Sequence, residues 1–130
     1  MLDVSGGKDA EGQAVIVYKK HGKVNQRWSV LYTDQVKAQT KGLHDDTGFH
    51  CNRPFYIVSR LPMNRVMESI GANNIAIKRW RKNVAAQTWT YNCADKTIRS
   101  NHWKNYAIEI QSNGGSTNLR CTSTINSRWW

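Results

Sequence analysis

Acidic residues recur at matching places along the chain, each flanked by apolar residues and followed by a polar, glycine-containing turn. These residues are Asp3, Glu68 and Glu109. Hydrolysis by a pair of carboxylates would need two such groups in different environments around one substrate. Glu68 and Glu109 instead come from equivalent positions of a repeated pattern, and no Ser/His/Asp or Cys/His arrangement for nucleophilic catalysis is evident. The sequence therefore predicts a protein that is not an enzyme.

Basic residues form two clusters, which we call the basic patch. The chain has 19 Lys and Arg against 9 Asp and Glu, a net charge of +10. This charge favours polyanionic partners such as sulfated or uronic glycans, membrane surfaces or nucleic acid. Nucleic acid is disfavoured because no RNA-binding motif with paired aromatics is present, and solvated hairpins with no partner are the alternative interpretation. The patch consists of Lys19, Lys20 and Lys23, followed by Lys78, Arg79, Arg81 and Lys82.

The spacing of the cysteines matches no redox or zinc motif. Cys51, Cys93 and Cys121 cannot all pair within the chain, and no two have Cys-x-x-Cys spacing. One internal disulfide with a free thiol and three reduced thiols are both compatible with the sequence, so the compartment stays open. The polar residues between positions 44 and 51 match no standard metal-binding signature. We expect no metal and no cofactor.

The composition is typical of one all-β domain. A chain of 130 residues with 39% hydrophobic residues can form a single core. Six Trp, five Tyr and nine Gly against two Pro favour strands and turns. Mean hydropathy is −0.67, and no apolar run approaches the roughly 18 residues of a membrane span. No signal peptide is evident, because the first residues have neither a charged segment nor an apolar one.

A pattern of strands and turns occurs three times along the chain. Each copy has the acidic residue, the turn, an alternating strand and a closing sequence similar to Gln-x-Trp. Since residues i and i+2 of a strand share a face, the Gln and Trp of the first two closing sequences point the same way, while the third has Ser127 in place of the Gln. We therefore place Trp28, Trp89 and Trp129 in the core, with the Gln amides satisfying backbone groups at a turn. The closing sequences are residues 25–28, 86–89 and 126–129.

The first copy carries an insertion of about 20 residues, because the anchoring tryptophans lie 61 and then 40 residues apart. We place this insertion at residues 33–53, a stretch with little periodicity. Two further strands, Pro54–Leu61 and Thr97–Asn101, complete the first two copies. The repeats then span approximately residues 1–64, 65–104 and 105–130 of a single domain.

These repeats resemble the ricin-type β-trefoil lectin family, whose hallmark is the Gln-x-Trp repeat. The first copy is especially similar to the family pattern, with Leu2-Asp3-Val4-Ser5-Gly6-Gly7 followed by Asn25-Gln26-Arg27-Trp28. The resemblance covers essentially the whole chain and implies an all-β trefoil with three pseudo-symmetric repeats of four strands. We expect eleven strands, with the last strand of the third repeat missing. A missing strand would mean that the chain is a fragment or that another element covers this edge.

The resemblance also implies a sugar site, for which the first repeat has every residue type. In this family an Asp on the first strand, an aromatic on the second and an Asn before Gln-x-Trp hold a sugar. The carboxylate accepts hydrogen bonds from hydroxyls, the aromatic ring packs on the C–H face of the sugar, and the amide both donates and accepts. The first repeat supplies Asp3, Tyr18, Asn25 and Gln26 for these roles.

The other two repeats match this set only in part and are weaker candidates. The second has Glu68, Trp80 and Gln87, but an alanine replaces the Asn, and we expect Trp80 to be displaced by one position. The third has Glu109 and Asn126 without an aromatic on its second strand. Glu in place of Asp moves the carboxylate by about one methylene, which disturbs a bidentate contact.

The sequence thus predicts a carbohydrate-binding, lectin-like module of an extracellular or cell-surface protein, with at most one good sugar site. Galactose-type or acidic glycans are the expected ligands. The alternative is a structural module that packs against other protein domains or copies of itself in an assembly or filament. In that case Asp3 caps a turn and Tyr18 is an ordinary strand aromatic. The weakened sites, the insertion and the odd cysteine favour the alternative, whereas the complete set in the first repeat favours the lectin.

Overall fold

Strands and short turns make up the described chain. The computed structural model describes residues 2–35, 50–70, 74–94, 96–103, 107–113 and 116–122. Within these ranges the regular elements are strands and single 3₁₀ turns, which confirms the all-β prediction. The strands are β1 (Leu2–Val4), β2 (Val15–Val17), β3 (Trp28–Tyr32), β4 (Phe55–Ser59), β5 (Val66–Ile70), β6 (Asn74–Lys78), β7 (Trp89–Asn92), β8 (Thr97–Ser100), β9 (Ala107–Asn113) and β10 (Ser116–Thr122). The 3₁₀ turns are η1 (Ser5–Gly7), η2 (Val24–Gln26), η3 (Thr33–Gln35) and η4 (Ala85–Gln87).

The first two strands of each repeat form an antiparallel hairpin with the same register. β1 pairs with β2, β5 with β6, and β9 with β10. In each hairpin the acidic residue of the first strand lies opposite one residue of the second strand. In the first repeat Tyr18 stands two places after that residue, so the residue two places after it in the other repeats is the equivalent of Tyr18. These opposed pairs are Asp3 with Ile16, Glu68 with Ala76, and Glu109 with Arg120.

The third and fourth strands also pair alike in the first two repeats. Trp28 of β3 lies opposite Ser59 of β4, and Trp89 of β7 lies opposite Ser100 of β8. The hydroxyl of each serine then accepts a hydrogen bond from a backbone N–H two residues later in the chain. β4 therefore has the place in the first repeat that β8 has in the second.

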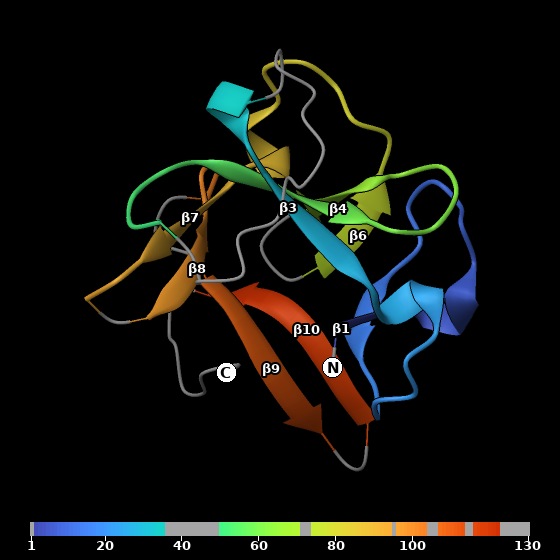
Figure 1. The fold of residues 1–130 in the computed structure, drawn as a ribbon. Coiled ribbons are helices and arrows are strands. Elements are labelled where there is room, and N and C mark those ends of the chain that lie inside the picture. The colour runs from blue at the N-terminus through green and yellow to red at the C-terminus, as the bar shows by residue number, and fades with distance from the viewer. Residues whose placement is uncertain are drawn as a thin grey trace.

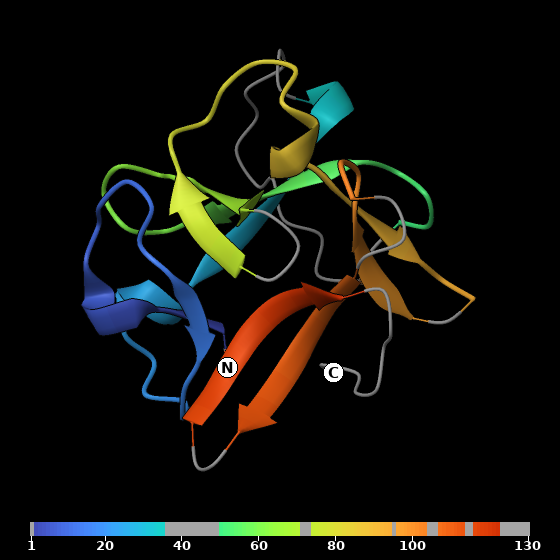
Figure 2. The same ribbon diagram turned by 180° about the vertical axis from the view of Figure 1, so that it is seen from behind.

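The second strands of the three repeats meet near the centre of the molecule. Asn118 of β10 pairs with Ile16 of β2, and an isolated bridge joins Ala14 to Ala76 of β6. β6 also contacts β10. Figure 2 shows β2 and β10 side by side, with the long β9–β10 hairpin crossing the lower part of the molecule as in Figure 1. The result is an arrangement of three similar units around one axis.

The core lies between these strands and is made mainly of aliphatic side chains around one large tryptophan. Trp89 is fully buried, whereas Trp28 is partly buried and packs against the edge of the core. Both indole N–H groups donate to a backbone carbonyl of the repeat's first strand, Trp28 to Leu2 and Trp89 to Met67, each at 3.2 Å. The equivalent Trp129 lies outside the described residues, as do Asn126 and the expected end of the third repeat.

The two ends of the predicted insertion are fastened to the domain. Cys51 forms a disulfide with Cys93, which follows β7, with the Cα atoms 5.5 Å apart. Arg53 makes two hydrogen bonds to the Asp34 carboxylate and lies over the Tyr32 ring, 4.1 Å from its centroid. Of the alternatives left open for the cysteines, the structure therefore has one internal disulfide. Residues 36–49 of the insertion lie outside the described chain.

Within the described ranges, no helix has the length and hydropathy that crossing a membrane requires. The limits of the three repeats given above remain a prediction.

Candidate functional site

A pocket of about 500 Å³ lies at the β1–β2 hairpin of the first repeat. Asp3, Tyr18 and Asn25 all line it, so the structure brings together three of the residues that the sequence singled out there. Gln26, the fourth, is buried behind the pocket wall. The complete lining is Asp3, Ser5, Gly6, Gly7, Ile16, Tyr18, His21, Lys23 and Asn25.

The Asp3 carboxylate is buried and accepts two side-chain hydrogen bonds. Only 3% of the residue is exposed. Oδ1 accepts a hydrogen bond from Asn25 Nδ2 at 3.0 Å, and Oδ2 accepts one from Gln26 Nε2 at 2.8 Å. His21 Nε2 also lies 3.2 Å from Oδ2. These contacts fix the direction in which the carboxylate faces the pocket.

Gln26 closes the hairpin behind this carboxylate. Its Nε2 also donates to the backbone carbonyl of Lys19 at 2.8 Å, while its Oε1 accepts from the backbone N–H groups of His21 at 2.9 Å and Gly22 at 3.3 Å. The buried amide thus satisfies backbone groups at a turn, as the Gln-x-Trp pattern predicts. Its role in the site is to position Asp3 rather than to line the pocket.

The η1 turn supplies one wall of the pocket. Gly7 has φ of +67°, a left-handed conformation that glycine adopts without steric cost. A Cβ atom at this position would lie 3.7 Å from Cγ of Asn25. The Asn25 amide also donates to the carbonyl of Val4 at 3.1 Å. The turn therefore packs closely against the amide that orients Asp3.

Tyr18 and His21 form the exposed side of the pocket. Tyr18 is 50% exposed, and its ring centroid lies 6.1 Å from that of His21. Nδ1 of His21 accepts a hydrogen bond from the backbone N–H of Lys23 at 3.1 Å. Nδ1 of the imidazole thus faces the backbone of Lys23, and Nε2 faces the Asp3 carboxylate.

The sequence prediction missed His21 as a site residue and placed Lys23 only in the basic patch. The available signal was their place in the chain, because both lie between Tyr18 and Asn25, the two residues that bound the site. A search restricted to the residue types of the family pattern does not include them. The hydrogen bond that places the His21 backbone recurs in the second repeat, whereas Lys23 has no basic counterpart there.

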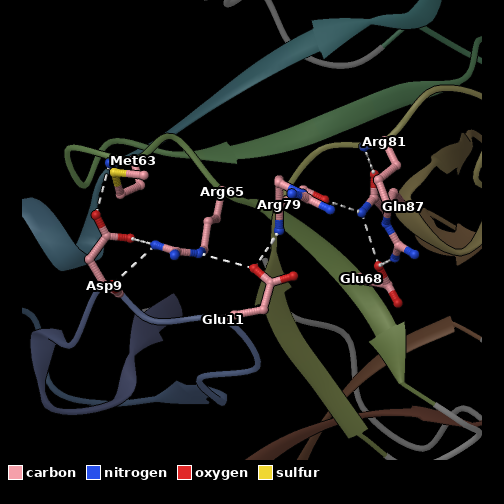
Figure 3. Close-up of polar contacts among 8 residues, drawn as sticks. All are labelled: Asp9, Glu11, Met63, Arg65, Glu68, Arg79, Arg81 and Gln87. Atoms are coloured by element: carbon pink, nitrogen blue, oxygen red, sulfur yellow. Dashed lines mark hydrogen bonds and ion pairs between the residues drawn. The ribbon is translucent and has the colours of Figure 1, made fainter.

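Gln87 of the second repeat makes the same kinds of contact as Gln26, but the carboxylate of this repeat forms an ion pair with an arginine. Gln87 Oε1 accepts from the backbone N–H of Arg81 at 2.9 Å, and Gln87 Nε2 donates to Glu68 at 2.9 Å and to the carbonyl of Arg79 at 2.7 Å. Arg81 therefore has the place of His21. Its guanidinium lies 2.6 Å from Glu68 Oε1, as the right side of Figure 3 shows.

Trp80 does not join this second set. By the hairpin register, Lys78 rather than Trp80 has the place of Tyr18. Trp80 is therefore displaced by two positions from the place of Tyr18, whereas the sequence predicted a displacement of one position. The Trp80 ring is 40% exposed and packs edge-on near Tyr56, with centroids 6.2 Å apart. No aromatic residue stands at the second repeat's equivalent of Tyr18.

The third repeat can be compared by strand register alone. Glu109 lies in β9 opposite Arg120, and Thr122 of β10 has the register position of Tyr18. This agrees with the predicted lack of an aromatic on that strand.

A second cleft, of about 400 Å³, lies where the first repeat meets the second and is lined by Glu11, Met63, Arg65 and Arg79. Arg65 lies 2.6 Å from Asp9 and 3.2 Å from Glu11. The Asp9 carboxylate also accepts from the backbone N–H of Met63 at 2.8 Å, and Glu11 accepts from that of Arg79 at 2.8 Å (Figure 3). These contacts tie the two repeats together.

The charges of this cleft perturb one another. Partial burial alone would raise the pKa of Glu11, but the hydrogen bond from the Arg79 backbone and the pairing with Arg65 hold that pKa below its usual value. Partial burial would lower the pKa of Arg65, but the hydrogen bonds to Asp9 and Glu11 raise it. The Arg65 guanidinium is therefore committed to these two carboxylates.

The basic patch lies in the connections between the second and third strands of the first two repeats. Lys19, Lys20 and Lys23 are exposed in the β2–β3 connection. Lys78, the last residue of β6, is half-buried, while Arg79, Arg81 and Lys82 are exposed in the β6–β7 connection. In the described part of the chain, no three His, Cys, Asp or Glu residues gather closely enough to hold a metal ion.

Solved structures match the strand arrangement over nearly the whole chain. A designed 3-fold symmetric protein, ThreeFoil, superposes with a TM-score of 0.70 at 18% identity, covering 97% of this chain and 83% of that one. This chain is a β-trefoil. The C-terminal domain of an earthworm lectin, solved as a mutant in complex with 6'-sialyllactose, matches the trefoil with a TM-score of 0.62 at 20% identity, covering 97% of this chain and 82% of that domain.

The predicted resemblance to the ricin-type β-trefoil is thereby confirmed at the level of the fold. No protein-family model and no curated protein sequence matches the trefoil.

Proposed function

We propose that this β-trefoil is a lectin-like module that binds a glycan in the first-repeat pocket. The observation that carries the proposal is the meeting of Asp3, Tyr18 and Asn25 around one cavity. A carboxylate, an aromatic face and an amide are the three kinds of contact that a sugar ring needs.

Each of these residues has a distinct role in the proposed site. The Asp3 carboxylate has about four lone-pair positions, and its two hydrogen bonds from Asn25 and Gln26 leave capacity for a sugar hydroxyl. The half-exposed Tyr18 ring offers a face for the C–H groups of the sugar. Asn25 lines the pocket and holds the carboxylate through its amide N–H. Gln26 keeps the hairpin in place behind them.

The other candidate sites contribute little under this proposal. The Arg81 guanidinium pairs with Glu68, an alanine replaces the Asn, and the Trp80 ring packs near Tyr56. A single shallow site binds weakly, with an expected Kd of about 0.1–1 mM. Strong attachment would then need several copies of the trefoil presented together.

The expected partners are galactose-type or acidic glycans at a cell surface or outside the cell. The earthworm lectin domain that shares this fold was solved with 6'-sialyllactose, an acidic galactose-containing glycan. The Cys51–Cys93 disulfide fits an oxidising compartment, where such bonds persist. Nothing in the proposed chemistry involves catalysis.

The test is a calorimetric titration of the trefoil with lactose and with 6'-sialyllactose. We expect saturable binding that falls at least about tenfold in Tyr18→Ala, because the aromatic face is lost. Trp80→Ala is the matched control, since Trp80 is an exposed aromatic on the equivalent hairpin of the second repeat, and it should bind as the wild type does. If neither glycan binds at tens of millimolar, the lectin proposal fails.

A structural module is the second candidate, favoured by the occupied carboxylate of the second repeat. Glu68 and Arg81 form an internal ion pair where a binding trefoil would keep a carboxylate for ligand. Such a module would pack against other protein domains or copies of itself. Sedimentation of the purified trefoil distinguishes the two candidates, because self-association without glycan binding would support the structural role.

A further inference from the structure

We propose that the first-repeat pocket selects acidic glycans, with Lys23 as the residue that contacts the acidic group. The ligand class is a sugar that carries a carboxylate or a sulfate close to the hydroxyl bound by Asp3. This inference rests on the proposed sugar site and adds the charge of its ligand.

The charges around the pocket are unequally paired. Asp3 is the one acidic residue in the pocket lining, and its carboxylate already receives Asn25, Gln26 and His21. Lys23 lines the same pocket, and no acidic side chain of the described residues pairs with its ammonium group. The pocket therefore presents a carboxylate held by neutral amide groups beside a lysine that pairs with no carboxylate of the described residues.

Other carboxylates of the described chain are committed elsewhere. Asp9 and Glu11 pair with Arg65, Asp34 pairs with Arg53, and Glu68 pairs with Arg81. In each of these pairs the cation is an arginine. Among the described residues no carboxylate is left to pair with Lys23, which makes an anionic ligand a candidate for that place.

The path from Asp3 to Lys23 is short. His21 Nε2 lies 3.2 Å from the Asp3 carboxylate, and His21 Nδ1 accepts from the Lys23 backbone N–H at 3.1 Å. One imidazole ring thus separates the carboxylate from the backbone of Lys23. A sugar whose hydroxyl reaches Asp3 has neighbouring substituents within the reach of the flexible lysine side chain.

The second repeat has no lysine at the place of Lys23. Lys23 immediately precedes the η2 turn, and Val84 holds the same place before η4 in the second repeat. The nearest cation to the second carboxylate, Arg81, is consumed by its ion pair with Glu68. Of the first two repeats, the first therefore has a lysine placed to contact an acidic ligand and the second does not.

Lys19 and Lys20 act at longer range. Both are exposed in the same hairpin, and the whole chain carries a charge of +10. A positive field of this kind raises the local concentration of anionic ligands, an effect that falls with salt. It does not by itself choose among acidic ligands, which is why a specific contact at Lys23 is the testable part.

The experiment compares lactose, 6'-sialyllactose and lactose 6'-sulfate by calorimetry at low ionic strength. We expect the two acidic ligands to bind about fivefold more tightly than lactose, the upper range for one partly exposed ion pair. Lys23→Gln should bring the ratio of acidic to neutral affinity to about one. Lys82→Gln removes the same charge from the second hairpin and should keep the wild-type ratio.

The outcomes separate the two proposals. Equal affinity for all three ligands overturns the inference while the sugar site stands. An equal loss in Lys23→Gln and Lys82→Gln also overturns it, because net charge and not a contact would explain the preference. No binding of any ligand overturns both proposals. A preference for the sialylated or for the sulfated sugar identifies which acidic group Lys23 meets.

Discussion

The Asp3 carboxylate holds the first hairpin together as well as facing the pocket. It accepts hydrogen bonds from Asn25 and Gln26, two side chains that are themselves buried, and it contacts His21. The sequence pattern alone suggests that Asp3→Ala would remove binding and leave the fold intact. The buried network gives a different expectation, because the alanine variant leaves buried donors without an acceptor.

We therefore expect Asp3→Ala to lower the free energy of unfolding by about 2–4 kcal/mol, measured by urea denaturation. Asp34→Ala is the control, since this carboxylate is exposed and pairs with Arg53 at the surface. Its loss should be much smaller. Equal losses in the two variants would show that the Asp3 network contributes no more than a surface ion pair.

At the scale of elements, the disulfide fastens the insertion to the second repeat. Cys51 and Cys93 are 42 residues apart in sequence, so their bond closes a long loop in the unfolded chain. Replacing both residues by serine should lower the free energy of unfolding by about 2–4 kcal/mol. Thermal denaturation of the double variant, and of the reduced wild type, measures this. A change within experimental error would mean that other contacts already fix this segment.

The cleft between the first two repeats makes stability depend on pH. The pKa of Glu11 is lowered in the folded trefoil from an ordinary value of 4.5. A lowered pKa contributes stability that is present above about pH 4.5 and is lost as the pH falls through the folded-state pKa. Glu11→Gln should therefore be less stable than wild type at pH 7, with the difference shrinking below pH 4.5. Urea denaturation at several pH values checks this, and a difference independent of pH would contradict it.

The hairpins show which parts of the site could be predicted from the sequence. The Gln-x-Trp pattern predicted the strands and the role of Gln26 and Gln87, because these depend on a period that the sequence displays directly. It did not predict the partners of the carboxylates. Gln26 accepts a hydrogen bond from a backbone N–H five residues earlier, and Gln87 accepts one from a backbone N–H six residues earlier. The connection from β6 to β7 is therefore one residue longer at this point than the connection from β2 to β3.

This difference of one residue between the two connections affects which side chains lie near the carboxylate, and the Gln-x-Trp pattern does not show it. It accompanies an arginine in place of His21 and a lysine in place of Tyr18, while Trp80 lies two positions away. The disulfide pairing was likewise open in the sequence, because three cysteines allow several states and only the fold brings two together.

At the scale of the whole molecule, three similar units enclose one core, but equivalent residues are not equally buried. Trp89 is fully buried, whereas Trp28 is partly buried. We expect Trp89→Ala to cost about 3–5 kcal/mol of unfolding free energy, and Trp28→Ala to cost less. Chemical denaturation of both variants measures the difference. A loss below about 1 kcal/mol for Trp89→Ala would be incompatible with its place in the core.

The central claim is that one repeat of this pseudo-symmetric trefoil binds a glycan and its equivalent in the second repeat does not. Titration of isotope-labelled protein with 6'-sialyllactose, followed by two-dimensional NMR, tests it most directly. We predict saturable shifts at Tyr18, His21 and Asn25, with no comparable change at their equivalents Lys78, Arg81 and Ala86. Equal shifts at both hairpins, or no saturable shift at Tyr18 at tens of millimolar, would contradict the account.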